Sequence, residues 1–132
     1  MGSVISVHER ERFAEQLVSL VRDRAIDSCD QLVSGTIGGP VGARWRDTVA
    51  DEAAKTAVRE LIPDIVDQVV FQLLDAIDND QLSLAWRKVD GSFAALEEIG
   101  EGEMAGWFMM GPGGWLDRYS SQRYFDPASS ES

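Results

Sequence analysis

The residues of this chain that could do chemistry are mainly carboxylates, and several of them share a helical spacing. Asp64 and Asp67 are three residues apart, and so are Asp75 and Asp78, so each pair would lie on one face of a helix. Carboxylates placed in this way hold magnesium or iron in some all-helical enzymes. The spacing therefore raises the hypothesis of a divalent-metal-dependent hydrolase that uses these four aspartates.

Other elements of a metal site are missing from the sequence. Di-iron carboxylate bundles also need two Glu-x-x-His elements, and the only histidine here is His8. The helical magnesium-dependent nucleotide pyrophosphohydrolases carry Glu-Glu-x-x-Glu followed by Glu-x-x-Asp, and neither is cleanly present. The stretch DAIDND, residues 75–80, lacks the glycine and the distal glutamate of a calcium loop. The simpler interpretation is a solvated acidic face, with no cofactor.

Nucleophilic catalysis has little support in the residues. His8 and Cys29 are the only histidine and cysteine, and both fall in one predicted helix. At 1.5 Å per residue they would be roughly 30 Å apart along its axis, too far to form a dyad. The glycine-rich stretch 34–42 lacks the lysine of a phosphate-binding loop, and it follows a helix where a dinucleotide-binding loop would follow a strand. We therefore expect a protein that is not an enzyme.

The other candidate for function is the aromatic C-terminal part of the chain. Eight of the eleven aromatic side chains follow Ala85. Trp, Tyr, Met and Arg are enriched at interface hot spots, which favours a recognition surface. Large rings also hold irregular segments against a core, which favours a simple cap. Both interpretations stay open for the candidate binding residues, which are Trp107, Trp115, Arg118, Tyr119 and Arg123.

Charge and composition narrow the class of partner. The 132 residues carry 23 acids and 12 bases, a net charge of -11, which disfavours nucleic acid and anionic membranes. A basic protein partner suits this charge better. The chain shows no apolar run of about 20 residues and no secretory signal pattern. With its single cysteine, it is expected to be a cytoplasmic protein with no disulfide of its own.

Apolar spacing predicts the elements that must position these residues. Recurring apolar side chains predict a long helix over 7–33, begun by a capping box of Ser6 and Glu9. A second helix is predicted over 44–61 and a third over 63–77, with a break at Pro63. The third is so apolar that it is expected to be central and covered on more than one side. These three principal helices define a mostly α fold.

The C-terminal part is predicted to be an irregular aromatic cap. Residues 82–86 alternate like a strand and could form a short β-hairpin with residues 107–110 or with the segment near Tyr124. A short helix is predicted over 92–100, capped by Ser92, and one helical turn over 115–120. The whole of 1–126 is expected to be one domain, with a frayed tail at 127–132.

The motifs of the second half also give a resemblance. LLDAIDND-LSL, followed by GEMAGWF, GGW, RYS and RYFD, resembles a group of small bacterial cytoplasmic proteins with a C-terminal Gly-Trp…Tyr-Ser signature. The resemblance implies no activity and transfers no catalytic residues. In size and acidity the chain is also similar to the immunity proteins of bacterial toxin systems. We expect a non-enzymatic protein-binding domain, of an immunity or regulatory kind, whose partner is a basic protein or a second copy as a homodimer.

Overall fold

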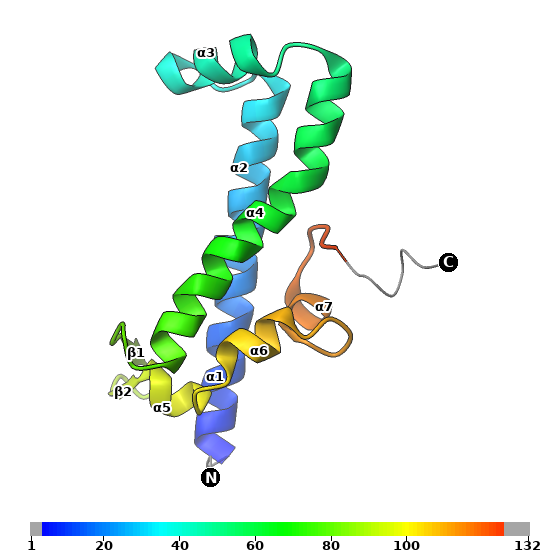
Figure 1. The fold of residues 1–132 in the computed structure, drawn as a ribbon. Helices are drawn as coiled ribbons and strands as arrows, with labels where there is room; N and C mark the ends of the chain where they lie inside the picture. The colour runs from blue at the N-terminus through cyan, green and yellow to red at the C-terminus, as the bar shows by residue number, and fades with distance from the viewer. Residues whose placement is uncertain (1–3, 126–132) are drawn as a thin grey trace.

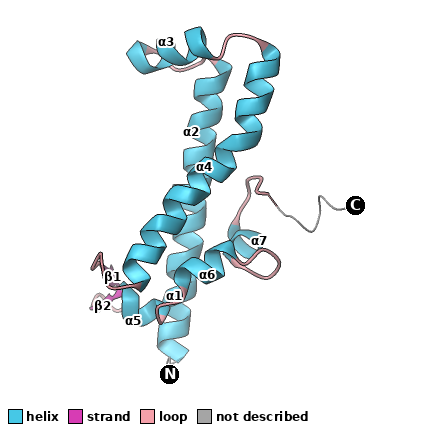
Figure 2. Ribbon diagram, in the orientation of Figure 1, coloured by secondary structure: helices cyan, strands magenta, loops and turns pink. Residues whose placement is uncertain are grey.

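Two long antiparallel helices form the frame of the structure, and a computed structural model describes residues 4–125 (Figure 1). The predicted frayed tail, 127–132, lies outside these residues. Helix dominates throughout, which confirms the mostly α fold (Figure 2). No helix of residues 4–125 is both long enough and apolar enough to cross a membrane. The elements in chain order are α1 (Val4–Gln16), η1 (Leu17–Arg22), α2 (Asp23–Ser34), α3 (Gly39–Thr48), α4 (Glu52–Asp78), β1 (Ala85–Arg87), β2 (Phe93–Ala95), α5 (Leu96–Gly100), α6 (Met104–Met109) and α7 (Trp115–Tyr119).

The first long helix is continuous through α1, η1 and α2, where apolar spacing predicts it, but its phase changes in the middle. η1 is a π-helical turn, in which the Asp23 backbone N–H donates to the carbonyl of Val18, five residues earlier. The wider turn rotates Arg22 into the interior, where it is 0% exposed. Leu20 and Val21 belong to the recurring apolar side chains that predict this helix, but they are 47% and 52% exposed.

The predicted break at Pro63 is wrong, because α4 passes through this residue without interruption. The chain is instead interrupted at residues 49–51, inside the predicted second helix, between the end of the short α3 and the start of α4. There Asp51 caps α4, and its carboxylate accepts a hydrogen bond of 2.7 Å from the Ala54 backbone N–H. Propensity alone marks proline as a helix breaker, and this position shows that tertiary contacts can override it.

The short β-hairpin is present but uses neither of the predicted partners. β1 pairs with β2 in antiparallel register, Trp86 opposite Ala94, across a turn at Gly91, whose φ is 87°. Residues 107–109 belong to α6, so they are helical where a strand was proposed. The helix predicted over 92–100 begins only at Leu96, because the residues before it are needed to complete the hairpin. The predicted helical turn at 115–120 is confirmed as α7.

Glu9 fixes the hairpin to the first helix, so the predicted capping box is also wrong. The helix already begins at Val4, and Glu9 lies inside it, 3% exposed. Its carboxylate accepts hydrogen bonds from Trp86 Nε1 at 3.1 Å and from the Val89 backbone N–H at 3.0 Å. The hydrogen bond from Val89 is the main reason why the pKa of Glu9 lies below its usual value. Arg12 completes the contact by donating to Glu9 and to the Arg87 carbonyl.

Two clusters of buried side chains make up the core. The aromatic end of the helix pair, formed by α1, the second half of α4 and α5–α7, buries rings such as Phe13, Phe108 and Trp115 with aliphatic neighbours. The aliphatic end, formed by α2, α3 and the first half of α4, buries Ile26, Val33, Val49 and Ile62. The predicted aliphatic body with an aromatic C-terminal cap is therefore present, but the cap covers only one end (Figure 1).

Candidate functional site

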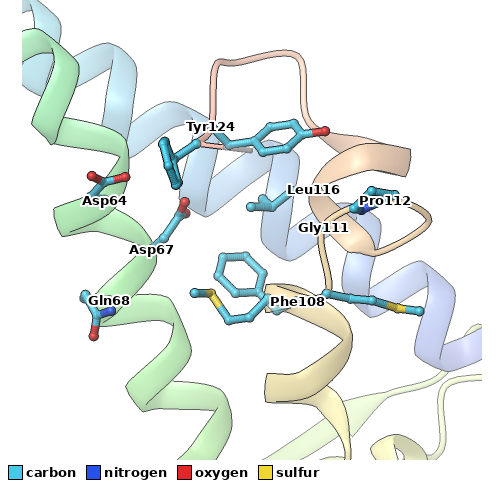
Figure 3. Close-up of a pocket in the computed structure, with 11 residues that line it drawn as sticks. Asp64, Asp67, Gln68, Phe108, Gly111, Pro112, Leu116 and Tyr124 are labelled. Atoms are coloured by element: carbon cyan, nitrogen blue, oxygen red, sulfur yellow. The ribbon is translucent and has the colours of Figure 1, made fainter. Parts of the chain in front are cut away.

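A groove of about 560 Å³ runs between α4 and the C-terminal part of the chain. The α4 side supplies Asp64, Asp67 and Gln68, and the opposite side is formed by residues 108–112, Leu116, Tyr124 and Phe125. Figure 3 shows the two sides facing each other, with Tyr124 at one end. Because the walls come from segments 40 residues apart or more, only the folded chain forms this groove.

The groove is mainly apolar, and several of its side chains are unusually exposed. Phe108 and Leu116 form a buried floor, at 0% and 7% exposure. Met109, Met110 and Phe125 stand around it at 47%, 59% and 64% exposure. Methionine is flexible and polarisable, so it adapts to differently shaped apolar ligands. A contiguous exposed set of this kind, with polar groups at its rim, is typical of an interaction site.

We call residues 108–112, Leu116, Tyr124 and Phe125 the C-terminal wall of the groove. A second hollow, of about 780 Å³, lies on the other side of Tyr124 and Phe125 in this wall. It shares Asp64, Tyr124 and Phe125 with the first groove, so the two hollows border the same wall. Its α4 side reaches back to Thr56 and includes Glu60. Asp64 and Glu60 are exposed and lie about one helical turn apart, which gives the rim an acidic side.

A buried arginine holds the C-terminal wall in place. The Arg22 guanidinium binds Asp67 through two hydrogen bonds, Nε to Oδ1 at 2.8 Å and Nη2 to Oδ2 at 3.1 Å. Its Nη1 donates to Asp23 Oδ1 at 3.0 Å and to the Ser120 hydroxyl at 2.9 Å. Its remaining N–H donates to the Arg123 carbonyl at 2.9 Å. All five donors of Arg22 are therefore satisfied, as burial of this group requires.

We call Arg22, Asp23, Asp67 and Ser120 the Arg22 cluster. Burial by itself lowers the pKa of Arg22, but hydrogen bonds and charges from Asp67 and Asp23 outweigh it and raise the pKa. Asp23 also accepts from the Ser120 hydroxyl and from the Ser121 backbone N–H, both at 2.8 Å. The cluster thus joins the first helix, α4 and the segment after α7 at one point. The π-helical turn makes it possible, because it directs Arg22 inward.

Arg123 fastens the segment after α7 to both long helices, through Asp30 on α2 and Arg59 on α4. Its guanidinium binds the Asp30 carboxylate on α2 through two contacts of 2.8 Å, which are the main reason why the pKa of Arg123 is raised. It also donates to the Arg59 carbonyl at 2.7 Å. That carbonyl is the one whose helical donor is missing, since Pro63 four residues later has no N–H. The arginine therefore supplies the hydrogen bond that the proline cannot.

The five predicted binding residues lie in the cap and are engaged within the chain. Trp115 is fully buried between Phe13 and Trp107, with ring centroids 6.2 and 6.3 Å away. Trp107 is half-buried, and its ring lies 4.6 Å from the Arg10 guanidinium. None of Trp107, Trp115, Arg118 and Tyr119 lines the groove, while Arg123 borders the second hollow. Their role in binding a partner stays a prediction.

Arg118 and Tyr119 both contact Glu11 on α1. The Tyr119 hydroxyl donates to Glu11 Oε1 at 2.6 Å, and the Arg118 guanidinium pairs with the same carboxylate. Burial first, and then the hydrogen bond to Glu11, raise the pKa of Tyr119 to about 12. These contacts fasten α7 to the first helix and leave Arg118 exposed and Tyr119 half-buried.

The four aspartates of the metal hypothesis have separate roles. Asp67 pairs with Arg22, and Asp75 accepts from the Asn79 side chain. Asp78 accepts from the backbone N–H groups of Met104 and Ala105, at the start of α6, while burial raises its pKa. Only Asp64 and Asp67 reach the groove. Among residues 4–125, no group of three or more His, Cys, Asp or Glu side chains is arranged to hold an ion.

The sequence-based search missed the side chains that wall the groove. Met109, Met110 and Phe125 belong to the aromatic C-terminal part of the chain, but residue type favours its tryptophans, arginines and Tyr119 as binding residues. The signal that could have identified them is the pair of adjacent methionines before Gly-Pro-Gly-Gly, because two neighbouring positions of a short helix cannot both face its core. No protein-family model, curated protein or solved structure matches the chain, so these assignments depend on its own geometry.

Proposed function

We propose that the chain is a protein-binding domain that takes an apolar segment of a partner, flanked by basic residues, into the groove between α4 and the C-terminal wall. The observation that carries this proposal is the exposure of Met109, Met110 and Phe125 around a buried floor. An apolar side chain of the partner would fill the space above Phe108 and Leu116 and remove these three side chains from water.

Charge favours a basic partner segment. The groove has Asp64 at its rim, Glu60 lies on the neighbouring turn of α4, and the chain as a whole carries a net charge of -11. Lys or Arg residues beside the apolar anchor would be attracted by this negative charge, which would speed association and orient the partner segment. Such binding suits a role of an immunity or regulatory kind. The lone Cys29 is consistent with action in a reducing compartment such as the cytoplasm.

A selection of displayed random peptides against the full chain tests this function. We expect the selected peptides to combine apolar anchors with net positive charge, and their affinity to fall as salt rises. Phe125→Ala should weaken binding about tenfold or more, as loss of a central anchor does. The matched control is Phe93→Ala on the hairpin, since Phe93 is 66% exposed and Phe125 is 64% exposed.

A second variant tests the role of charge. Asp64→Lys should lower the affinity of the basic peptides and make their binding less sensitive to salt. The proposal is contradicted if the selected peptides have no charge preference, or if Phe125→Ala and Phe93→Ala change their affinity equally.

A further inference from the structure

The guanidinium of Arg123 lies in a site that the two long helices build between them. Asp30 on α2 offers both carboxylate oxygens, each 2.8 Å from an Arg123 nitrogen. The carbonyl of Arg59 on α4 accepts a third hydrogen bond, at 2.7 Å. This carbonyl is available because Pro63, four residues later, has no N–H to donate to it. We call the Asp30 carboxylate and the Arg59 carbonyl the arginine site.

The arginine site suits a guanidinium better than an ammonium. Two N–H groups of the planar fork meet the two carboxylate oxygens, and a further hydrogen of the same group reaches the carbonyl. The ammonium of lysine is a compact point charge without this geometry. The long helices supply both acceptors, while the segment after α7 supplies only the donor. Another arginine could therefore use the same acceptors.

The segment after α7 holds Arg123 in this site through contacts at the surface. Three aspartates on one face of α2 accept hydrogen bonds from three successive residues of the segment. The pairs are Asp23 with Ser121, Asp27 with Gln122, and Asp30 with Arg123. The Arg123 and Asp30 side chains are 40% and 27% exposed. Water reaches this last pair, and ion pairs in contact with water exchange partners at little cost.

The position of Arg123 determines the position of part of the groove. Tyr124 and Phe125 follow it directly in the chain, and both line the groove and the second hollow. Figure 3 shows Tyr124 at one end of the groove, opposite Asp64 and Asp67 on α4. Arg123 is the last residue before them that contacts both long helices. An empty or differently filled arginine site would therefore release this part of the C-terminal wall.

We propose that the arginine site is a regulatory site, where Arg123 is the internal ligand and an arginine side chain of another protein competes with it. A competitor in the site displaces Arg123, so Tyr124 and Phe125 leave the wall and the groove loses affinity for its partner segment. The two ligands then oppose each other reciprocally. This regulation rests on the proposed function of the groove, whereas binding of arginine at the site does not.

The competitor is an arginine within a protein segment, because Arg123 is tethered. A tethered group competes at an effective concentration of the order of millimolar, so a single free arginine displaces it poorly. A protein segment can add contacts to Asp27, which is exposed one turn before Asp30 on the same face of α2. The net charge of -11 also attracts a basic segment.

Removal of the internal ligand opens the site to measurement. In the full chain carrying Arg123→Ala, we expect N-acetyl-argininamide to bind about tenfold more tightly than in the wild type, where the tethered Arg123 competes. N-acetyl-lysinamide has the same charge and should bind Arg123→Ala about fivefold more weakly than the arginine derivative. Asp30→Asn added to Arg123→Ala should abolish this difference. Titrations followed by nuclear magnetic resonance measure all of these affinities.

Arg24→Ala is the matched control, because it removes the same charge from an exposed position on α2 and should behave as the wild type. Circular dichroism should show both alanine variants folded. Arg123→Lys keeps the charge but loses the fork, so it should also admit the arginine derivative more readily than the wild type does. The proposal is overturned if Arg123→Ala binds N-acetyl-argininamide no better than Arg24→Ala does, or if it binds the lysine derivative equally well.

Chymotrypsin measures the release of the wall without any ligand in the groove. We expect cleavage after Tyr124, identified by mass spectrometry, to be faster in Arg123→Ala than in Arg24→Ala. Peptides selected against the groove should bind Arg123→Ala about tenfold more weakly than Arg24→Ala. Equal cleavage, or equal peptide affinity, overturns the regulatory role. A selection that yields no peptides contradicts the function proposed for the groove, while the titrations and the cleavage still decide whether the arginine site exists and holds the wall.

Discussion

At the aromatic end of the helix pair, rings from α6 and α7 add a further layer over α1 and α4, whereas at the aliphatic end only the short α3 lies beside the two long helices (Figure 1). The buried cluster at the aromatic end is correspondingly larger. Burial of apolar area is the dominant favourable term in folding, so most of the stabilisation is expected to come from the aromatic end. The aliphatic end should open more readily in the native state.

The segment after α7 compensates for this difference by polar contacts. It leaves the aromatic end at Tyr119 and reaches the first half of α4 at Arg59, and on the way it binds the Arg22 cluster and Asp30. The same segment supplies Tyr124 and Phe125 to the wall of the groove. The candidate site therefore lies where the two ends meet, and charged contacts hold one part of its wall in place.

Breaking the Arg22 cluster should have the largest effect on this arrangement. Arg22→Met leaves the buried Asp67 carboxylate without its cation, which costs about 3–5 kcal/mol of unfolding free energy. Arg24→Met is the control, since Arg24 is exposed on the same helix and its loss should cost less than about 0.5 kcal/mol. Urea unfolding measures both. Equal costs would show that the cluster does not join the two ends.

Trypsin gives a second measurement of the same variant. In the wild type the peptide bond after Arg123 is held near the Arg22 guanidinium. We expect cleavage after Arg123 to be much faster in Arg22→Met than in Arg24→Met, because the segment loses its central attachment. Unchanged cleavage would indicate that Asp30 and Arg59 hold the segment without help from the cluster.

The sequence predicted the parts of the fold that depend on local apolar spacing. The first helix, the aromatic cap around Trp115 and the α7 turn follow from spacing and from the area that rings bury, so they were recoverable. The continuity of α4 was not, because Pro63 is tolerated through an arginine that contacts Arg59 from 64 residues away. Local propensity contains no information about such a partner.

The candidate site was less predictable for a related reason. Which aromatic residues are exposed depends on how the C-terminal segment lies across the helices, and that is set by Arg22. Apolar spacing does not indicate that Arg22 is buried, because no feature of the pattern predicts the π-helical turn. Of the two tryptophans predicted as binding residues, Trp115 is buried and Trp107 is half-buried, and Phe125 was not among the predicted residues. The role of the tryptophans in binding stays a prediction.

A double-mutant cycle between Arg123 and Pro63 sharpens the account of the aliphatic end. Arg123→Met removes the Asp30 pair and the hydrogen bond to the Arg59 carbonyl, and should cost about 1–2 kcal/mol. Pro63→Ala returns a backbone N–H to that carbonyl. In this background the cost of Arg123→Met should fall by about 0.5–1 kcal/mol. An identical cost in both backgrounds would mean that the Asp30 pair alone explains the contribution of Arg123.

The last expected effect concerns the aromatic end and appears only at high pH. The pKa of Tyr119 is raised from 10.0 to about 12, so the folded state binds the phenol proton more tightly than the unfolded state. This contribution to stability is complete below pH 10 and is lost as the pH rises from 10 to about 12. Tyr119→Phe should lose this part of the pH dependence of stability, as urea unfolding across the window measures.

Glu11 separates the two causes of this shift. Burial is the larger cause and the hydrogen bond to Glu11 the second, so Glu11→Gln should lower the pKa of Tyr119 without returning it to 10.0. Ultraviolet absorbance of the phenolate measures the change, with Tyr119→Phe as the blank. A pKa that does not move would show that the Glu11 contact forms only weakly in solution. The attachment of α7 to the first helix would then depend on the apolar packing of Trp115 and its neighbours.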